Sequence, residues 1–323
     1  MMKTVVTDCR RTFMNLYSEQ QRNNDLSAFE YVKSLESEDG LTGDANDFHN
    51  FATELARVDY YEAACEVLKQ GVLMYPFDTD LLADFVLYAH KCGKRDIAKE
   101  KYNQLKAIDS VDWTWRGFVF SIDYHIDLLK GQKGEERKAT QKTIEALIGS
   151  FKENLKQEEK AFLAESDYYE AIGNYQKAIE VLKGIVDNGI IKVCPQCCLR
   201  LTDRFLENGE YDSVSYYAKK GITMAEEQES VETTAFWYFW ALAEDHKWFN
   251  ENLSSDDPDR AKAKYVIKLY DTTISLNPNT RYLSICDKRK NMIASFAGID
   301  LPKKEPSSSD MNQLFRLLKQ KAE

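Results

Sequence analysis

The chain has 323 residues, of which 43% are hydrophobic and 30% are charged, with only 14 glycines and 6 prolines. This composition is typical of a helix-rich protein and argues against a β-rich fold, which needs more turn residues. The net charge of −10 argues against nucleic-acid binding, because Lys and Arg contacts to phosphates supply most of the affinity there. No apolar run approaches the roughly 20 residues of a membrane span. Residues 1–11 do not read as a signal segment, so we expect a cytoplasmic protein with no membrane partner.

The N-terminal part is predicted to form two helices within residues 4–37, each with an apolar face. The polar, glycine-containing stretch 37–47 follows, and Asp44 or Asn46 can cap the next helix. We therefore expect residues 1–44 to form an N-terminal helical cap or a small appended module.

The central part repeats itself. One set of residues recurs 34 positions later: Phe48, Phe51, Tyr61, Ala64 and Leu68 are followed by Leu82, Phe85, Arg95, Ala98 and Tyr102. A second set recurs at a spacing of 36: Phe162, Tyr169, Gly173, Tyr175, Ala178 and Leu182 are followed by Cys198, Phe205, Gly209, Tyr211, Val214 and Ala218. A constant period of this length, with small and large apolar residues in a set order, indicates stacked helix-turn-helix units.

Four phrases carry the repeat, and each places Gly or Asp at the turn and a small residue shortly after it. They are YYEAACEVLKQGVLMYP at 60–76, GKRDIAKEKYNQL at 93–105, GNYQKAIEVLKGIV at 173–186 and GEYDSVSYYAKKGI at 209–222. In these phrases the chain resembles the tetratricopeptide repeat (TPR) superfamily. The resemblance covers roughly residues 45–297 and implies an all-α fold, a right-handed superhelical solenoid of TPR-like helix-turn-helix repeats.

Two longer connectors interrupt the rhythm, at 131–140 and 250–260. We expect them to lengthen the turns between the helices of the third and sixth units. Insertions of this kind gather on one face of an array, either as tolerated surface loops or as part of the working face.

The resemblance also implies a partner-binding groove, because fixed positions of each first helix line the concave face in this superfamily. In the first two units the candidates at these positions are basic: His49, Arg57, His90 and Lys91. In the units at 159–226 they are acidic: Asp167, Glu170, Asp203 and Glu207. The family's clamp for a C-terminal carboxylate is not reproduced. We therefore expect a protein or peptide partner with basic residues, the alternative being that the acidic side chains are simply solvated.

The sequence offers little for catalysis or metal binding. Cys194-Pro-Gln-Cys197, followed by Cys198, is the one segment with metal-like spacing, but a zinc site needs four ligands and no second such pair exists. We expect no metal, no cofactor and no disulfide, the alternatives being a reactive thiol at Cys194 or a metal bound at these cysteines. No Gly-rich phosphate loop, GxSxG, HExxH or kinase motif is present, so we expect no enzymatic activity.

The C-terminal segment 298–323 is predicted to be a linker followed by an amphipathic helical tail. Residues 298–310 are rich in Pro, Ser and Lys. The apolar positions of the tail are Met311, Leu314, Phe315 and Leu318, flanked by Arg316, Lys319 and Lys321. Such a face needs a surface to pack on, so we expect it to dock in the acidic part of the groove or on another protein, unless it is a disordered terminus.

Together these features predict a non-enzymatic interaction scaffold or adaptor that binds a peptide or helix in the concave groove. The alternative is a regulatory or sensory subunit whose array responds to a peptide or small ligand and controls a partner effector. The two differ in residues 1–40, which pack as an end cap in the first case and project as an output module in the second.

Overall fold

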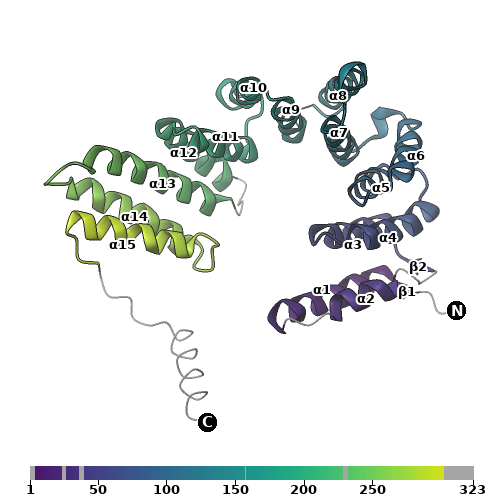
Figure 1. The fold of residues 1–323 in the computed structure, drawn as a ribbon, viewed down its shortest axis with the longest axis horizontal. Helices are drawn as coiled ribbons and strands as arrows, with labels where there is room; N and C mark the ends of the chain where they lie inside the picture. Colours follow the sequence, from purple (N-terminus) through teal and green to yellow (C-terminus); the bar gives the residue numbers. More distant parts are fainter. Residues whose placement is uncertain (1–3, 24–26, 36–39, 157, 228–231, 302–323) are drawn as a thin grey trace, which may run out of the picture. The chain divides into compact units, whose positions relative to one another are not determined.

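The computed structural model describes residues 4–23, 27–35, 40–156, 158–227 and 232–301 (Figure 1). The chain divides into two compact units, Met1–Lys192 and Val193–Glu323. The helices of the first unit are α1 (Val6–Asn23), α2 (Ser27–Leu35), α3 (Ala45–Arg57), α4 (Tyr61–Met74), α5 (Thr79–Lys91), α6 (Arg95–Lys106), a 3-10 turn η1 (Ser110–Asp112), α7 (Trp115–Leu129), α8 (Gly134–Asn154), α9 (Glu159–Ala171) and α10 (Tyr175–Asn188). Those of the second are α11 (Pro195–Glu207), α12 (Tyr211–Glu227), α13 (Thr233–Asn252), α14 (Arg260–Leu276) and α15 (Leu283–Ala297).

The two N-terminal helices pack onto the first repeat. α1 contacts α3, and α2 contacts α4. Phe13 of α1 is fully buried, and its ring centroid lies 6.1 Å from that of Phe51 and 6.2 Å from that of Tyr60. A short parallel pair of strands, β1 (Thr4–Val5) and β2 (Leu41–Thr42), joins the stretch after α2 to the start of α1. Residues of the predicted polar connector thus tie the N-terminal helices to the array.

The turn inside a helix pair has the same backbone conformation in four pairs. It contains a residue with positive φ: Asp59 (64°), Gly93 (79°), Gly173 (81°) or Gly209 (73°). Glycine adopts this left-handed conformation without a steric penalty, and Asp tolerates it better than most residues. The backbone therefore explains why Gly or Asp stands at the turn of each repeat phrase, either as its first residue or just before it.

Some of the helix starts are capped by side chains, as the sequence predicts for Asp44. The Asp44 carboxylate accepts a hydrogen bond from the Asp47 backbone N–H at 2.9 Å, and Asp47 accepts one in return from the Asp44 N–H at 3.0 Å. The Asp78 carboxylate accepts from the Leu81 N–H at 2.9 Å at the start of α5. Such caps satisfy backbone donors that have no partner within the helix.

Small residues lie where helices approach closely. Ala64, Ala98 and Ala178 of the repeat phrases are between 0% and 2% exposed. Gly71 of α4 lies against Phe48 of α3, where an added Cβ would come within 2.9 Å of Cγ of the ring. Packing at this density leaves no room for a larger side chain.

The second unit stacks α11 to α15, each helix on the next. Asp245 of α13 joins three of these helices, because it accepts two hydrogen bonds from the Arg289 guanidinium of α15, at 2.6 and 2.8 Å, and one from the Tyr270 hydroxyl of α14, at 2.7 Å. Asp245 is fully buried. A buried carboxylate needs such partners, because leaving it unpaired costs several kcal/mol.

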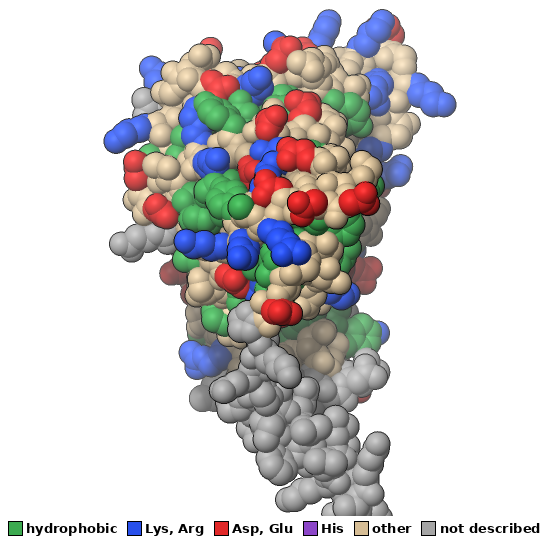
Figure 2. Space-filling model, turned by 90° about the vertical axis from the view of Figure 1, so that its left-hand side faces the viewer, with side chains coloured by type: hydrophobic (Ala, Val, Ile, Leu, Met, Phe, Trp, Pro, Cys, Tyr) green, Lys and Arg blue, Asp and Glu red, His purple; other side chains and the backbone are tan. Residues whose placement is uncertain are grey.

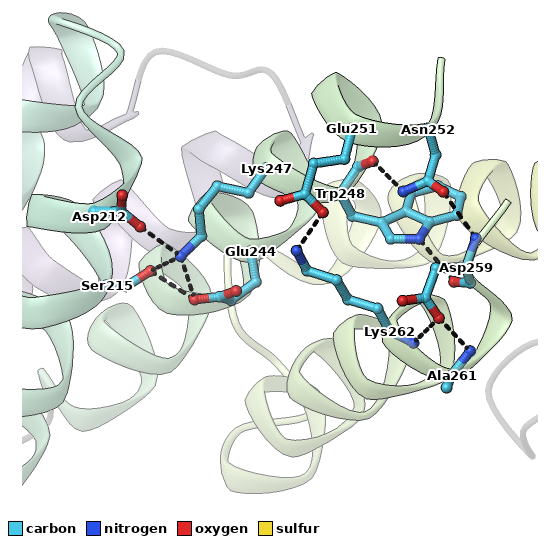
Figure 3. A network of polar contacts seen from close by, with 10 residues as sticks. All are labelled: Asp212, Ser215, Glu244, Lys247, Trp248, Glu251, Asn252, Asp259, Ala261 and Lys262. Carbon is cyan, nitrogen blue, oxygen red and sulfur yellow. Dashed lines mark hydrogen bonds and ion pairs between the residues drawn. The ribbon is translucent and has the colours of Figure 1, made fainter. Parts of the chain in front are cut away.

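The connector after α13 is held in place by hydrogen bonds (Figure 3). The indole of the fully buried Trp248 donates to the backbone oxygen of Asp259 at 2.9 Å, and the Asn252 side chain accepts from the Asp259 N–H at 2.8 Å. The Asp259 carboxylate in turn caps α14. The predicted turn at 250–260 is therefore an ordered corner of the second unit.

The other predicted connector, 131–140, differs from expectation. Helix α8 begins at Gly134 and has 21 residues, so most of this stretch extends the helix and not the turn. Glu135 and Glu136 lie in the first turn of α8, where carboxylates interact favourably with the helix dipole. Over the part of the chain that the structure describes, no helix combines the length and the apolar character that crossing a membrane requires.

Candidate partner-binding surface

The first helices of the pairs form a layer of their own in the first unit. α5 packs on α3, α7 on α5 and α9 on α7, while α4, α6, α8 and α10 each pack on the preceding first helix. In Figure 1, α5, α7 and α9 lie on the inner side of this unit, and α6, α8 and α10 on the outer side. Side chains that point inward from the first helices therefore share one surface, which we call the inner face.

His49, one of the predicted groove residues, lies in the helix interface beneath the inner face. It is 4% exposed and forms an ion pair with Asp84 of α5, which is fully buried. Burial raises the pKa of Asp84 to about 6, against the opposing effect of the His49 hydrogen bond and charge. This pair holds α3 against α5.

The other basic candidates of the first unit lie nearer the surface. The Arg57 side chain is 63% exposed and contacts the Glu54 carboxylate at 2.8 Å. Lys91 pairs with Asp127 of α7. His90 is half-buried, and its ring lies edge-on to Tyr124 with 5.2 Å between the centroids.

A cleft of about 710 Å³ opens beside His90. Its walls come from the ends of α5 and α7, from Arg95 of α6 and from the α7–α8 turn, including Lys130. Burial lowers the pKa of His90 and outweighs the opposing charge of Asp127, so the imidazole is neutral at pH 7. The cleft thus offers a neutral aromatic ring between charged side chains of both signs.

The middle of the inner face is acidic. Asp123 and Asp127 lie one turn apart on α7, and Asp167 of α9 is near enough to Asp123 to affect its charge. Burial raises the pKa of Asp123 to about 6, and the carboxylates of Asp167 and Asp127 add to this effect while Lys91 opposes it. Burial would also raise the pKa of Asp127, but hydrogen bonds from Lys130 and Lys91 hold it below its usual value. Asp123 therefore sits in an excess of negative charge.

Sequence reasoning missed Asp123 and Asp127. The groove positions were assigned only in the first two units and in the units at 159–226, which leaves out the helix that carries both aspartates. In the structure α7 begins at Trp115, after η1, because the Thr114 hydroxyl accepts a hydrogen bond from the Arg116 N–H at 3.1 Å and caps the helix. Asp123 is thus the ninth residue of α7, as Asp167 is the ninth residue of α9. Asp127 is the thirteenth residue of α7, which is also a groove position.

The remaining acidic candidates lie on two different helices. Glu170 is half-buried on α9, together with Asp167. In the second unit, Asp203 is half-buried on α11, and Glu207 is exposed with its carboxylate 2.7 Å from Arg204. Within the first unit the structure thus pairs Lys91 with Asp127 and places Asp167 near Asp123. The tail residues Met311, Leu314, Phe315 and Leu318 lie outside the described residues.

The polar side chains of α13 serve packing and not a surface site (Figure 3). Lys247 reaches Glu244 at 2.8 Å and Asp212 of α12 at 3.1 Å, and Ser215 donates to Glu244 at 2.8 Å. Burial would raise the pKa of Glu244, but the hydrogen bonds from Lys247 and Ser215 lower it. This network joins α12 to α13.

The outer helices of the second unit expose apolar side chains. Tyr265 of α14 and Ile285, Met292 and Phe296 of α15 are between 39% and 51% exposed. Figure 2, which looks onto the side of the C-terminal helices, shows hydrophobic patches among side chains of both charges.

Three features identify the fold: the stacked helix pairs, the turn geometry that they share, and the buried alanines between their helices. This is an all-α array of TPR-like repeats. The prediction from the sequence is thereby confirmed. No protein-family model matches the chain, and the search of curated proteins finds no match either. Among solved structures, a thermophilic TPR protein from Thermus thermophilus is similar to it at 16% identity, with a TM-score of 0.45, over 62% of this chain and 98% of that one.

Proposed function

We propose that the protein is a non-enzymatic scaffold that binds a basic peptide or helix of another protein along the first helices of its repeats. The observation that carries this proposal is the acidic centre of the inner face, formed by Asp123, Asp127 and Asp167. TPR-like arrays are binding surfaces built by stacking, and the inner layer supplies an extended one.

The electrostatics of Asp123 favour a cationic partner. Its ionised form is destabilised by burial and by the neighbouring carboxylates, with Lys91 as the opposing charge. A Lys or Arg side chain brought to this place relieves the repulsion and gains a charge-assisted hydrogen bond. Such complementarity mainly raises specificity and the association rate, and it weakens with added salt.

The packing of the N-terminal helices supports a scaffold over a regulatory subunit. Phe13 is buried against Phe51 and Tyr60, and Arg10 of α1 lies 3.3 Å from Glu54 of α3. A segment anchored in this way behaves as an end cap of the array, which shields the apolar face of the first repeat.

The test begins with affinity capture and mass spectrometry, followed by titration of a synthetic peptide that spans the mapped segment of the partner. We expect this segment to contain Lys or Arg. Combining Asp123→Asn with Asp167→Asn should weaken binding at least about tenfold and reduce its salt dependence. The matched control combines Glu100→Gln with Glu180→Gln, two exposed carboxylates on the second helices α6 and α10.

A second pair of variants tests the part of the proposal in the second unit. Asp203→Lys with Glu207→Lys on α11 should abolish binding of a basic peptide segment that contacts the first helices of the second unit. Glu226→Lys with Glu227→Lys on α12 changes the charge equally and should have little effect. Unchanged affinity in both the Asp123 and the Asp203 variants would show that the partner uses another surface.

A further inference from the structure

A pocket of about 490 Å³ lies in the first unit among α6, the stretch 108–113 and α8. In Figure 1 both helices lie on the outer side of this unit, so the pocket is separate from the inner face. Pockets for small ligands have volumes of roughly 300–1,000 Å³. The size of this pocket therefore suits a small molecule.

The bottom of the pocket is apolar and partly aromatic. Trp113 is only 4% exposed, and its indole N–H donates a hydrogen bond to the backbone oxygen of Ile108 at 3.3 Å, so the polar atom of the ring is satisfied within the protein. Tyr102 of α6 and Ala146 and Leu147 of α8 extend the apolar lining. The pocket thus offers two aromatic rings to the body of a ligand.

Hydrogen bonds hold the walls of the pocket together. The Asn154 side chain of α8 donates to the backbone oxygen of Ser110 at 2.9 Å and to its hydroxyl oxygen at 3.3 Å, which joins η1 to α8. The Thr143 hydroxyl, also in the lining, donates to the backbone oxygen of Ala139 at 3.2 Å. The fold itself therefore forms the pocket, as is usual for small-molecule sites.

The rim of the pocket is cationic. Lys106, at the end of α6, and Lys142 of α8 are exposed and line it. Among the residues that the structure describes, neither ammonium group has a hydrogen bond or an ion pair. Asp109 is the acidic residue of the described lining, and its carboxylate accepts a hydrogen bond from the Val111 N–H at 3.1 Å. Two lysines and one aspartate leave the lining with a net charge of +1, which a single negative charge on a ligand neutralises.

We propose that this pocket binds a small aromatic monocarboxylate. The ring of the ligand packs against Trp113 and Tyr102, where aromatic pairing adds to the free energy gained from burial of apolar area. The carboxylate lies at the rim and accepts charge-assisted hydrogen bonds from Lys106 and Lys142. A neutral ligand leaves both ammonium groups without a partner, and a polyphosphate brings more negative charge than the lining balances. The proposal does not depend on the binding of a basic peptide to the inner face.

The test titrates 2-naphthoate into the full chain by isothermal titration calorimetry. We expect one saturable site per chain, an affinity that falls with added salt, and a higher Tm for the protein in excess ligand. The alcohol 2-naphthalenemethanol, which has the same ring system without the charge, should bind at least about tenfold more weakly. Absence of saturable binding of 2-naphthoate would overturn the proposal, and so would equal affinity for the alcohol.

Variants place the ligand. Lys106→Met with Lys142→Met removes both charges, keeps unbranched side chains and should weaken the binding of 2-naphthoate at least about tenfold. Lys99→Met with Lys138→Met is the matched control, because these exposed lysines lie on the same two helices outside the pocket, and its affinity should equal that of the original chain. Ala146→Phe should fill the pocket and abolish binding without lowering the Tm, because Ala146 is exposed. Equal affinity in the two lysine double variants, or undiminished binding by Ala146→Phe, would show that the ligand does not bind here.

Discussion

Gly221 of α12 lies against the ring of Phe236 of α13 so closely that an added Cβ would come within 2.2 Å of Cε1 of the ring. Phe236 is fully buried, and its rigid ring cannot withdraw without opening the interface between α12 and α13. The absence of a side chain at Gly221 is thus what allows these two helices of the second unit to pack.

The first prediction is that Gly221→Ala destabilises the second unit. Overpacking of this kind costs about 1–3 kcal/mol, although alanine is by itself the better helix former. Urea unfolding followed by circular dichroism measures the change. Gly184→Ala in α10 is the control: nothing lies within 4 Å of its added Cβ, so this variant should be more stable by about 0.5–1 kcal/mol. Equal behaviour of the two variants would contradict the close contact.

The second prediction concerns the small residues of the repeat phrases. Replacing Ala64, Ala98 or Ala178 by Leu should cost about 1–3 kcal/mol each, because these positions are buried between helices. Thermal unfolding of each variant measures the loss. Ala146→Leu, at an exposed position of α8, should change the stability little. Three variants with unchanged Tm would mean that the alanines do not lie at close helix crossings.

The third prediction is a dependence of stability on pH that differs between two aspartates of α7. The pKa of Asp123 is about 6 in the folded chain, above the ordinary value of 3.8 that we take for the unfolded chain. The folded state therefore binds more protons than the unfolded state between these values, and the group destabilises the protein above pH 6. Asp123→Asn should raise the free energy of unfolding at pH 7 on the order of 1–2 kcal/mol. This gain should disappear as the pH falls from 6 to about 4.

Asp127→Asn is the control for the third prediction, because its change in the free energy of unfolding should have the opposite sign. Its pKa is lowered in the folded chain by Lys130 and Lys91, against the effect of burial. It therefore stabilises the fold above its unfolded pKa, and this contribution is lost as the pH falls through the lowered value. Asp127→Asn should accordingly destabilise the protein at pH 7. If Asp123→Asn and Asp127→Asn changed the free energy of unfolding in the same direction at pH 7, the charge arrangement of the inner face would be contradicted.

The fourth prediction concerns the C-terminal segment. Deleting residues 302–323 removes the apolar positions Met311, Leu314, Phe315 and Leu318 together with five basic side chains. If the tail docks in the acidic groove of its own chain, the deletion should raise the affinity for a basic peptide. If it docks on another protein, the deletion should remove that partner from affinity capture. Replacing Leu314 and Phe315 by Ser in the full chain should reproduce either result, and no change in any of these assays would leave a disordered terminus.

Much of the fold could be predicted because it depends on local features of the sequence. At Asp59, Gly93 and Gly173 the turn requires a backbone conformation that few residue types adopt. At Ala64 and Ala98 the narrow space between paired helices requires a small side chain. These constraints recur at a constant period, so they are visible without any knowledge of long-range contacts.

The details of the candidate sites were decided by the tertiary structure. His49 and Asp84 are 35 residues apart, and Cys198 and Met224 are 26 apart, yet both pairs are in contact. The sequence by itself placed His49 on the groove and did not reveal the contact between Cys198 and Met224. Which side chains meet depends on the relative rotation and axial shift of neighbouring helices, and a displacement of one residue along a helix turns a side chain by roughly 100°. The period determines that the helices stack, whereas the packing of large and small side chains in each interface determines which charges and sulfurs they bring together.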